Sequence, residues 1–217
     1  MPPVERFICR FAAEPPQDDA PDGDWAATLQ AEFLAACLRI DTEGEELGEA
    51  EQLRWFPDRT WAGRSYVPVT ARTTTGLEVF GYVSFAPGHR DENGDDVEPG
   101  EFDAVADFTD ELAERHPEWR MDICEEVVGG WRGENGAVAA MTLVWGVPLV
   151  HGGRVATAEL SNLAVDQCAI QNDRFTLLAP DAYRSDYLDI KLWDGDGREL
   201  AAESLYIEDD EDDEDEE

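Results

Sequence analysis

Two acidic blocks alternate with two nearly neutral blocks along this chain, and the alternation limits where a hydrophobic core can form. Residues 14–51 hold 12 acids and one Arg, and residues 89–126 hold 15 acids and three Arg. Residues 52–88 have two acids against four Arg, and residues 127–180 have four acids against three Arg. We therefore expect the neutral blocks to build most of the core, while the acidic blocks turn a charged face to water.

The chain is long enough for one large domain, because 42% of its 217 residues are hydrophobic and seven are Trp. We expect a single domain over residues 1–207. The element order leaves open a duplicated helix-plus-hairpin unit, with halves at about residues 14–88 and 89–180. Residues 208–217 are all acidic, and a run of like charges with no apolar group to bury predicts a disordered, solvated tail.

Two segments have the spacing of amphipathic helices. The first follows Asp24, a good N-cap, and runs to about Arg39. Its apolar residues recur at steps of three and four: Trp25, Leu29, Phe33, Cys37 and Ile40. The second follows Pro99 and stops at Pro117, with acids near its start and basic residues in its last turn, where the charges oppose the helix dipole. Its apolar residues are Phe102, Val105, Phe108 and Leu112.

Most other apolar stretches are typical of strands. They are residues 4–13, 52–55, 61–71, 77–85, 119–128, 137–150, 154–165, 174–178, 187–193 and 199–207. Two connections indicate hairpins: His151-Gly152-Gly153, and the turn Asp194-Gly195-Asp196-Gly197. Helices grouped apart from runs of strands predict an α+β fold, in which two main helices pack on an antiparallel sheet of hairpin-connected strands.

Compartment and membrane contact can be inferred from the cysteines and the charge. Cys9, Cys37, Cys124 and Cys168 are far apart and form no C-x-x-C pair, so we expect reduced thiols and a cytoplasmic protein. The N-terminus has no basic region followed by an apolar run, and no stretch approaches the roughly 18 apolar residues of a membrane span. A net charge of −35 would be repelled by anionic lipid, so we expect no membrane partner.

No residue pattern identifies an enzyme or a metal site. The loop Asp91–Glu98 is rich in carboxylates, but an EF-hand calcium loop would need Gly and Glu where Asp96 and Phe102 stand. The three His are not spaced as zinc ligands, and the Gly-rich stretch 127–136 matches neither the dinucleotide nor the phosphate-loop pattern. We expect no metal and no cofactor, and a binding protein rather than an enzyme. A Cys–His pair that meets only in the fold stays open.

The charge predicts a basic protein partner. If the two acidic blocks covered about a third of the surface, their charge density would approach that of duplex DNA. Such a face suits an inhibitor, an immunity-type protein or a nucleic-acid mimic, and it disfavours direct binding of nucleic acid. The candidate partner-binding acids are Asp41, Glu43, Glu45, Glu46, Asp95, Asp96, Glu101, Asp103, Asp107, Asp110 and Glu111. Trp55 and Trp61 are candidate aromatic anchors, although both also suit a core.

Salt adaptation is the alternative explanation of the acidity. High acid content with a single Lys is typical of proteins that live in concentrated salt. In that case the acids serve solvation, and the function, for example that of a small-ligand enzyme, is unrelated to charge. Salt adaptation predicts acids over every exposed surface, whereas a binding module predicts acids gathered on one side.

Overall fold

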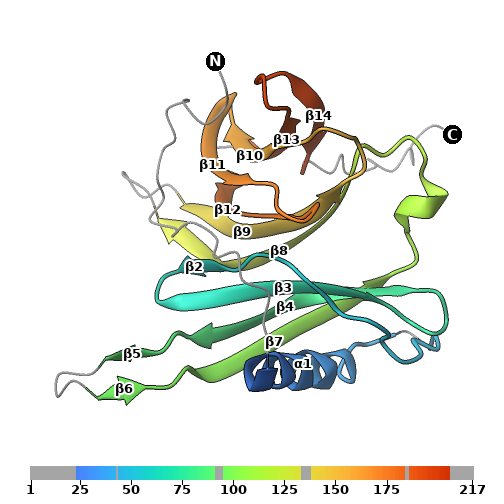
Figure 1. Ribbon diagram of the computed structural model, residues 1–217, viewed down its shortest axis with the longest axis vertical. Helices are drawn as coiled ribbons and strands as arrows, with labels where there is room; N and C mark the ends of the chain where they lie inside the picture. The colour runs from blue at the N-terminus through green and yellow to red at the C-terminus, as the bar shows by residue number, and fades with distance from the viewer. Residues whose placement is uncertain (1–22, 43, 91–94, 133–137, 184–185, 206–217) are drawn as a thin grey trace, which may run out of the picture.

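The computed structural model describes residues 23–42, 44–90, 95–132, 138–183 and 186–205 (Figure 1). The strand expected at 4–13, Glu43, loop residues 91–94 and the acidic tail 208–217 lie outside these ranges, as does the side chain of Asp24. Within the described ranges, no helix has the length and apolar character needed to cross a membrane.

The protein is mostly β, so the expected α+β fold with two main helices is wrong. Of the described residues, strands account for 57% and helices for only 9%, with one α-helix and several antiparallel sheets. The helix, α1, spans Gly23–Cys37, and a short 3-10 turn, η2, spans Ala113–Arg115. The expected duplication of a helix-plus-hairpin unit stays a prediction.

Helix α1 and three sheets form four successive layers (Figure 1). The helix-covered sheet consists of β1 (Arg54–Trp55), β2 (Arg59–Trp61), β3 (Arg64–Arg72), β4 (Glu78–Ala86) and β7 (Gly100–Thr109). The middle sheet has the order β12 (Phe175–Asp181), β9 (Val138–Pro148), β8 (Met121–Arg132). The outer sheet has the order β11 (Leu163–Ala169), β10 (Val155–Leu160), β13 (Asp189–Trp193), β14 (Glu199–Ser204). Between β4 and β7, β5 (His89–Arg90) and β6 (Asp96–Val97) form a separate ribbon.

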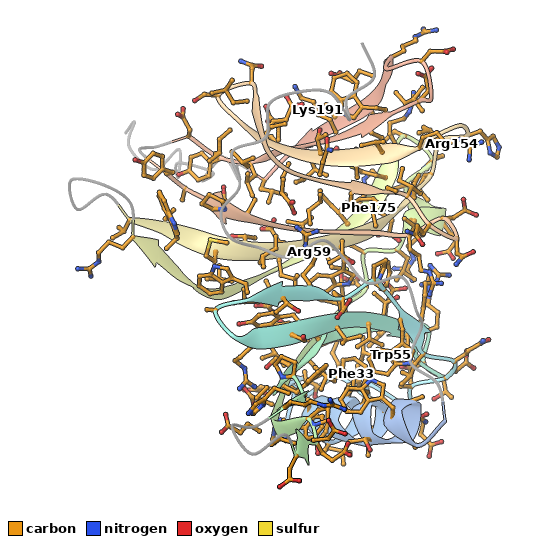
Figure 2. The ribbon with its side chains drawn as sticks, turned by 60° about the vertical axis from the view of Figure 1, so that its left-hand side comes forward. Phe33, Trp55, Arg59, Arg154, Phe175 and Lys191 are labelled. Atoms are coloured by element: carbon orange, nitrogen blue, oxygen red, sulfur yellow. The ribbon has the colours of Figure 1, made fainter. Side chains whose placement is uncertain are left out.

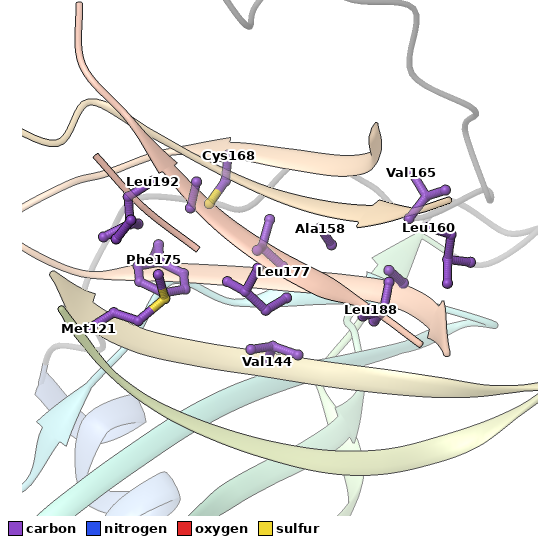
Figure 3. Packing of buried hydrophobic residues seen from close by; sticks show 14 residues of the cluster. Met121, Val144, Ala158, Leu160, Val165, Cys168, Phe175, Leu177, Leu188 and Leu192 are labelled. Carbon is purple, nitrogen blue, oxygen red and sulfur yellow. The ribbon is translucent and has the colours of Figure 1, made fainter. Parts of the chain in front are cut away.

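The middle sheet is buried on both faces and belongs to two hydrophobic cores. On β9, Leu143 and Trp145 pack toward the helix-covered sheet, while Val144 between them packs toward the outer sheet. On β12, Leu178 packs toward the helix-covered sheet. Phe175 packs toward the outer sheet (Figure 3). This explains why residues 137–150 form an almost continuous apolar run instead of an alternating one.

The first expected helix is confirmed as α1. Leu29 and Phe33 are fully buried against the helix-covered sheet, and Trp25, Cys37 and Ile40 pack around them (Figure 2). Each large side chain buried in this way contributes about 1.5–3 kcal/mol to stability. Because a helix of this length is marginal in isolation, packing on the sheet is what holds it.

The second expected helix is wrong, because its first ten residues form the edge strand β7. The same residues fit a period of two: Phe102 and Phe108 pack toward α1, whereas Glu101, Asp103 and Asp107 are exposed. Pairing with β4 along its whole length favours the strand over the helix. The hydrogen bonds to β4 satisfy the backbone N–H and C=O groups that a helix would satisfy within itself. Within the segment predicted to be helical, the 3-10 turn η2 is the part that adopts a helical conformation.

One expected hairpin is confirmed and the other is wrong. Strands β13 and β14 pair across the turn at Asp194, whose Oδ1 accepts hydrogen bonds from the N–H groups of Asp196 and Arg198 at 2.9 Å each. The connection His151-Gly152-Gly153 joins no hairpin, because β9 already pairs with β8 and β12 on its two sides. The chain therefore passes there from the middle sheet to the outer sheet, where β10 pairs with β11 and β13.

Candidate functional site

A cleft of about 520 Å³ opens at the seam between the helix-covered sheet and the middle sheet. We call it the seam cleft. One wall comes from β1, β3 and β4, and the other comes from the start of β8, the end of β9 and the η2 turn. Its charged lining residues are Glu51, Arg54, Arg72, Glu78, Glu114 and Asp122.

Arg72 forms ion pairs with two carboxylates of the seam cleft. Its Nε lies 3.3 Å from Glu78, and its Nη2 forms a hydrogen-bonded ion pair with Glu114. Burial and the nearby Asp122 charge raise the pKa of Glu78, and Arg72 offsets this only in part. The three side chains form a network that carries one net negative charge when both carboxylates are ionised.

Arg54 and Asp122 are opposite in charge and are not paired. In the part of the chain that the structure describes, neither side chain has a hydrogen bond or an ion pair. Burial raises the pKa of Asp122, and the Arg72 and Arg54 charges act in the opposite direction. Arg54 is therefore close enough to influence Asp122, but the two do not neutralise each other by direct contact.

The inner end of the seam cleft is narrow, and aromatic and thiol side chains join the charged lining there. Phe56, Cys124 and Trp145 line a space of about 10 Å³, which is room for one water molecule. Trp145 is fully buried, and its Nε1 finds no hydrogen-bond acceptor among the described residues. Buried indole N–H groups normally have a partner, so an unsatisfied donor on a residue that lines the inner space is notable.

Two of the thiols do not support nucleophilic chemistry. Burial, followed by the charges of Asp122 and Glu78, raises the pKa of Cys124 well above its usual value. Burial also raises the pKa of Cys37 to about 11. Because the thiolate is the nucleophile, both groups would be unreactive near neutral pH.

Three of the predicted partner-binding acids share one face of β7. Glu101, Asp103 and Asp107 are exposed at alternate positions of this edge strand, on the side away from α1. We call these three residues the β7 acidic strip. Asp107 also has a structural role, since its Oδ1 accepts a hydrogen bond of 2.8 Å from the N–H of Phe108.

Glu126 on β8 joins the β7 acidic strip and was missed by sequence reasoning. Burial and the Asp107 charge raise its pKa. Tyr82 lies in the same region. Burial raises its pKa to about 12, and the negative charges of Glu126 and Asp103 contribute to this increase. Only the stacking of the middle sheet on the helix-covered sheet brings Glu126 near β7, so no local pattern in the sequence could have revealed it.

The other predicted acids lie in separate places. Asp41, Glu45 and Glu46 are exposed on the connection after α1, which is tied to the β3–β4 turn by a hydrogen bond from Thr75 Oγ1 to the carbonyl of Leu47. Asp95 and Asp96 lie on the β5–β6 ribbon at the opposite end of the helix-covered sheet (Figure 1). Asp110 and Glu111 follow β7, where Glu111 contacts the His116 ring.

The two candidate aromatic anchors are partly buried. Trp55 packs against the core under α1, and Trp61 packs against the core between the helix-covered and middle sheets. A Cβ at Gly129 would lie 2.6 Å from the Trp61 ring, so the ring sits directly on this glycine. Both side chains therefore contribute to packing.

A second carboxylate with an altered pKa lies on the opposite face of β8. Glu125 borders a cleft of about 280 Å³ that also contacts Met121, Ile123 and the end of β14. Burial, then the charges of Asp181 and Glu126, raise the pKa of Glu125 to about 7. Its ionised form is thus disfavoured in the folded protein.

Replacing Glu125 with Gln should stabilise the protein at neutral pH and leave its stability unchanged near pH 4. An acid whose pKa is raised by folding costs stability as the pH rises from its ordinary pKa of about 4.3 through the folded value, here about 7. Because the carboxylate keeps contact with solvent, we expect a gain of about 1 kcal/mol or less. Urea unfolding at several pH values measures it; parallel curves for the two proteins would contradict the assignment.

Comparison with known proteins gave no match to a family model, to a curated protein or to a solved structure. The function must therefore be inferred from the residues themselves.

Proposed function

We propose that this protein is a binding module for a basic protein, and that the β7 acidic strip together with Glu126 forms the centre of its contact surface. The observation that carries the proposal is that Glu126 lies close enough to Asp107 for the Asp107 charge to add to burial in raising the pKa of Glu126. In the described ranges, no Lys or Arg forms an ion pair with Asp103, Asp107 or Glu126. Like charges held together cost stability, and a cationic partner would relieve that repulsion on binding.

The surface would act mainly on association rate and specificity. Glu101 forms an ion pair with Arg64, but the other carboxylates of the surface have no such partner among the described residues. They attract Lys and Arg side chains over a distance of about one Debye length, roughly 8 Å at physiological salt. An inhibitor, an immunity-type protein and a nucleic-acid mimic all use this type of surface against a basic groove. The expected contact lies on strands, not on the helical face that the sequence suggested, because the second acidic block forms β7.

Partner capture across a range of salt concentrations tests the proposal. A partner isolated from the native cell extract should bind more weakly as ionic strength rises. The variant Glu101→Gln/Asp103→Asn/Asp107→Asn should weaken binding by about tenfold or more. The Asp107→Asn change keeps a side-chain oxygen that can accept the hydrogen bond from the Phe108 N–H.

The matched control removes the same number of charges from the outer sheet. The variant Asp196→Asn/Glu199→Gln/Glu203→Gln alters three exposed carboxylates of the β13–β14 hairpin. It should bind the partner almost as well as the unmodified protein. Affinity that does not depend on salt, or an equal loss for both variants, would overturn the proposal.

Salt adaptation remains the second candidate, and a specific observation favours it. Asp196, Glu199 and Glu203 are exposed on the outer sheet, in addition to the acids on the helix-covered sheet. Thermal unfolding at low and at about 2 M salt separates the two candidates, because salt at that concentration screens charges beyond a few ångströms. A salt-adapted protein should lose much of its stability when salt is removed, whereas a binding module should not.

A further inference from the structure

The seam cleft presents two opposite charges that the protein does not satisfy. Arg54 is exposed at the rim on β1, and the Asp122 carboxylate is partly buried on β8. Both lack an ion pair within the described ranges, although the chain has more than three acids for each basic residue. Several described Arg residues lack an ion pair, but Arg54 is the one that lines the seam cleft. A partly buried carboxylate without a partner costs free energy.

The neighbouring network gives neither of these two groups a direct ion-pair partner. Arg72 is held by Glu78 and Glu114 and is not available to Asp122 as an ion-pair partner. At the inner end, the buried Trp145 Nε1 adds a hydrogen-bond donor that has no acceptor among the described residues. The cleft thus offers a cation, an anion and a neutral donor at separate points of one space.

Ligands with a single charge fit this lining poorly. A simple anion attracted to Arg54 would meet Asp122 and the strongly negative field of the whole protein. A simple cation would be attracted by the four carboxylates of the lining, but it would leave Arg54 without a counter-ion. A molecule that carries both charges can satisfy Arg54 and Asp122 together, and a volume of about 520 Å³ lies in the range of small-molecule sites.

We propose that the seam cleft binds a small zwitterion, with its carboxylate at Arg54 and its ammonium group at Asp122. The chemical class is that of an α-amino acid or a short peptide. Carbonyl or hydroxyl groups of the ligand can reach the Trp145 Nε1, directly or through one water in the inner space. This site goes beyond the proposed function and does not depend on it, because none of its lining residues belongs to the β7 acidic strip.

Thermal unfolding with a panel of probes provides the first test. The panel contains the common L-amino acids, simple dipeptides, acetate and methylammonium, all at the same concentration and ionic strength. At least one zwitterion should raise the unfolding temperature in a saturable manner, because a ligand that binds only the folded state stabilises it. Stabilisation by dipeptides alone would identify a peptide ligand, and stabilisation by a free amino acid would identify a metabolite.

Two variants connect the binding to the proposed groups. Arg54→Gln and Asp122→Asn should each weaken the best zwitterion by about 10- to 100-fold, the effect expected for loss of one charge-assisted hydrogen bond. Arg132→Gln, which removes an exposed Arg at the far end of β8, is the matched control and should bind normally. The indole N–H signal of Trp145, assigned in nuclear magnetic resonance spectra with Trp145→Phe, should shift when the zwitterion binds.

Three outcomes would overturn the proposal. The first is that no zwitterion in the panel stabilises the protein or shifts the Trp145 signal. The second is that acetate or methylammonium stabilises it as much as the best zwitterion, which would indicate nonspecific ion binding. The third is that both cleft variants bind as tightly as the Arg132→Gln control.

Discussion

Replacing Arg59 with Leu should lower the free energy of unfolding by about 3 to 5 kcal/mol, the loss typical of breaking a buried ion pair. Arg59 on β2 is 1% exposed, and its Nη2 forms a hydrogen-bonded ion pair with Asp166 on β11 (Figure 2). This contact ties the helix-covered sheet to the outer sheet. Without the guanidinium, Asp166 would remain as an isolated charge in the interior. Equilibrium unfolding in urea measures the loss.

Two further variants test whether charge is the cause. Asp166 also accepts a hydrogen bond of 2.8 Å from the N–H of Leu178, and Asn at this position would keep an acceptor. The double variant Arg59→Leu/Asp166→Asn should therefore be more stable than Arg59→Leu alone. Arg90→Leu is the matched control, because it breaks an exposed ion pair with Asp96 and should cost less than about 1 kcal/mol. Equal losses for Arg59→Leu and Arg90→Leu would refute the explanation.

The pH dependence of the Arg59→Leu variant should also change. Burial already raises the pKa of Asp166 in the intact protein, against the opposing effect of Arg59. Loss of the guanidinium would raise that pKa further. Since an acid with a raised folded pKa destabilises the fold as it ionises, the variant should regain stability as the pH falls.

Phe33→Ala should destabilise the protein by about 3 to 5 kcal/mol, as expected for a large aromatic side chain removed from a core. Phe33 is fully buried between α1 and the helix-covered sheet. The variant should lose helical circular dichroism before the strand signal, because α1 is held by this contact. Leu38→Ala, one residue beyond the helix, is the control: Leu38 is 89% exposed, so its loss should change stability by about 0.5 kcal/mol or less. Similar losses for both variants would show that α1 does not depend on the Phe33 contact.

The elements that sequence reasoning predicted well were those with a single consistent pattern. The stripe from Trp25 to Ile40 fits only a helical period, and α1 follows it. The turn at Asp194 combines glycines with a side chain that accepts two backbone hydrogen bonds, and the β13–β14 hairpin follows it. Residues 100–109 fit both a helical and a strand period, and the decision depended on the partner strand β4, which local spacing does not reveal.

The candidate site was less predictable because it forms between sheets. Asp122 and Glu126 both lie on β8, yet one lines the seam cleft and the other approaches the β7 acidic strip. The sequence shows Arg54 only as a neighbour of Trp55, and its unpaired state in the seam cleft depends on how the middle sheet stacks. Charge counting identified the acidic segments, but it could not show which carboxylates meet.

The two-sided middle sheet has a consequence for protein synthesis. Tyr66 and Tyr82 of the helix-covered sheet are buried by residues of β9 and β12. The second of these strands, β12, ends at Asp181. The nascent chain must therefore leave the ribosome at least as far as Asp181 before the aromatic face formed by β3 and β4 is shielded. Until then that face is a natural target for chaperones, and fragments that stop before β12 should be recovered as aggregates.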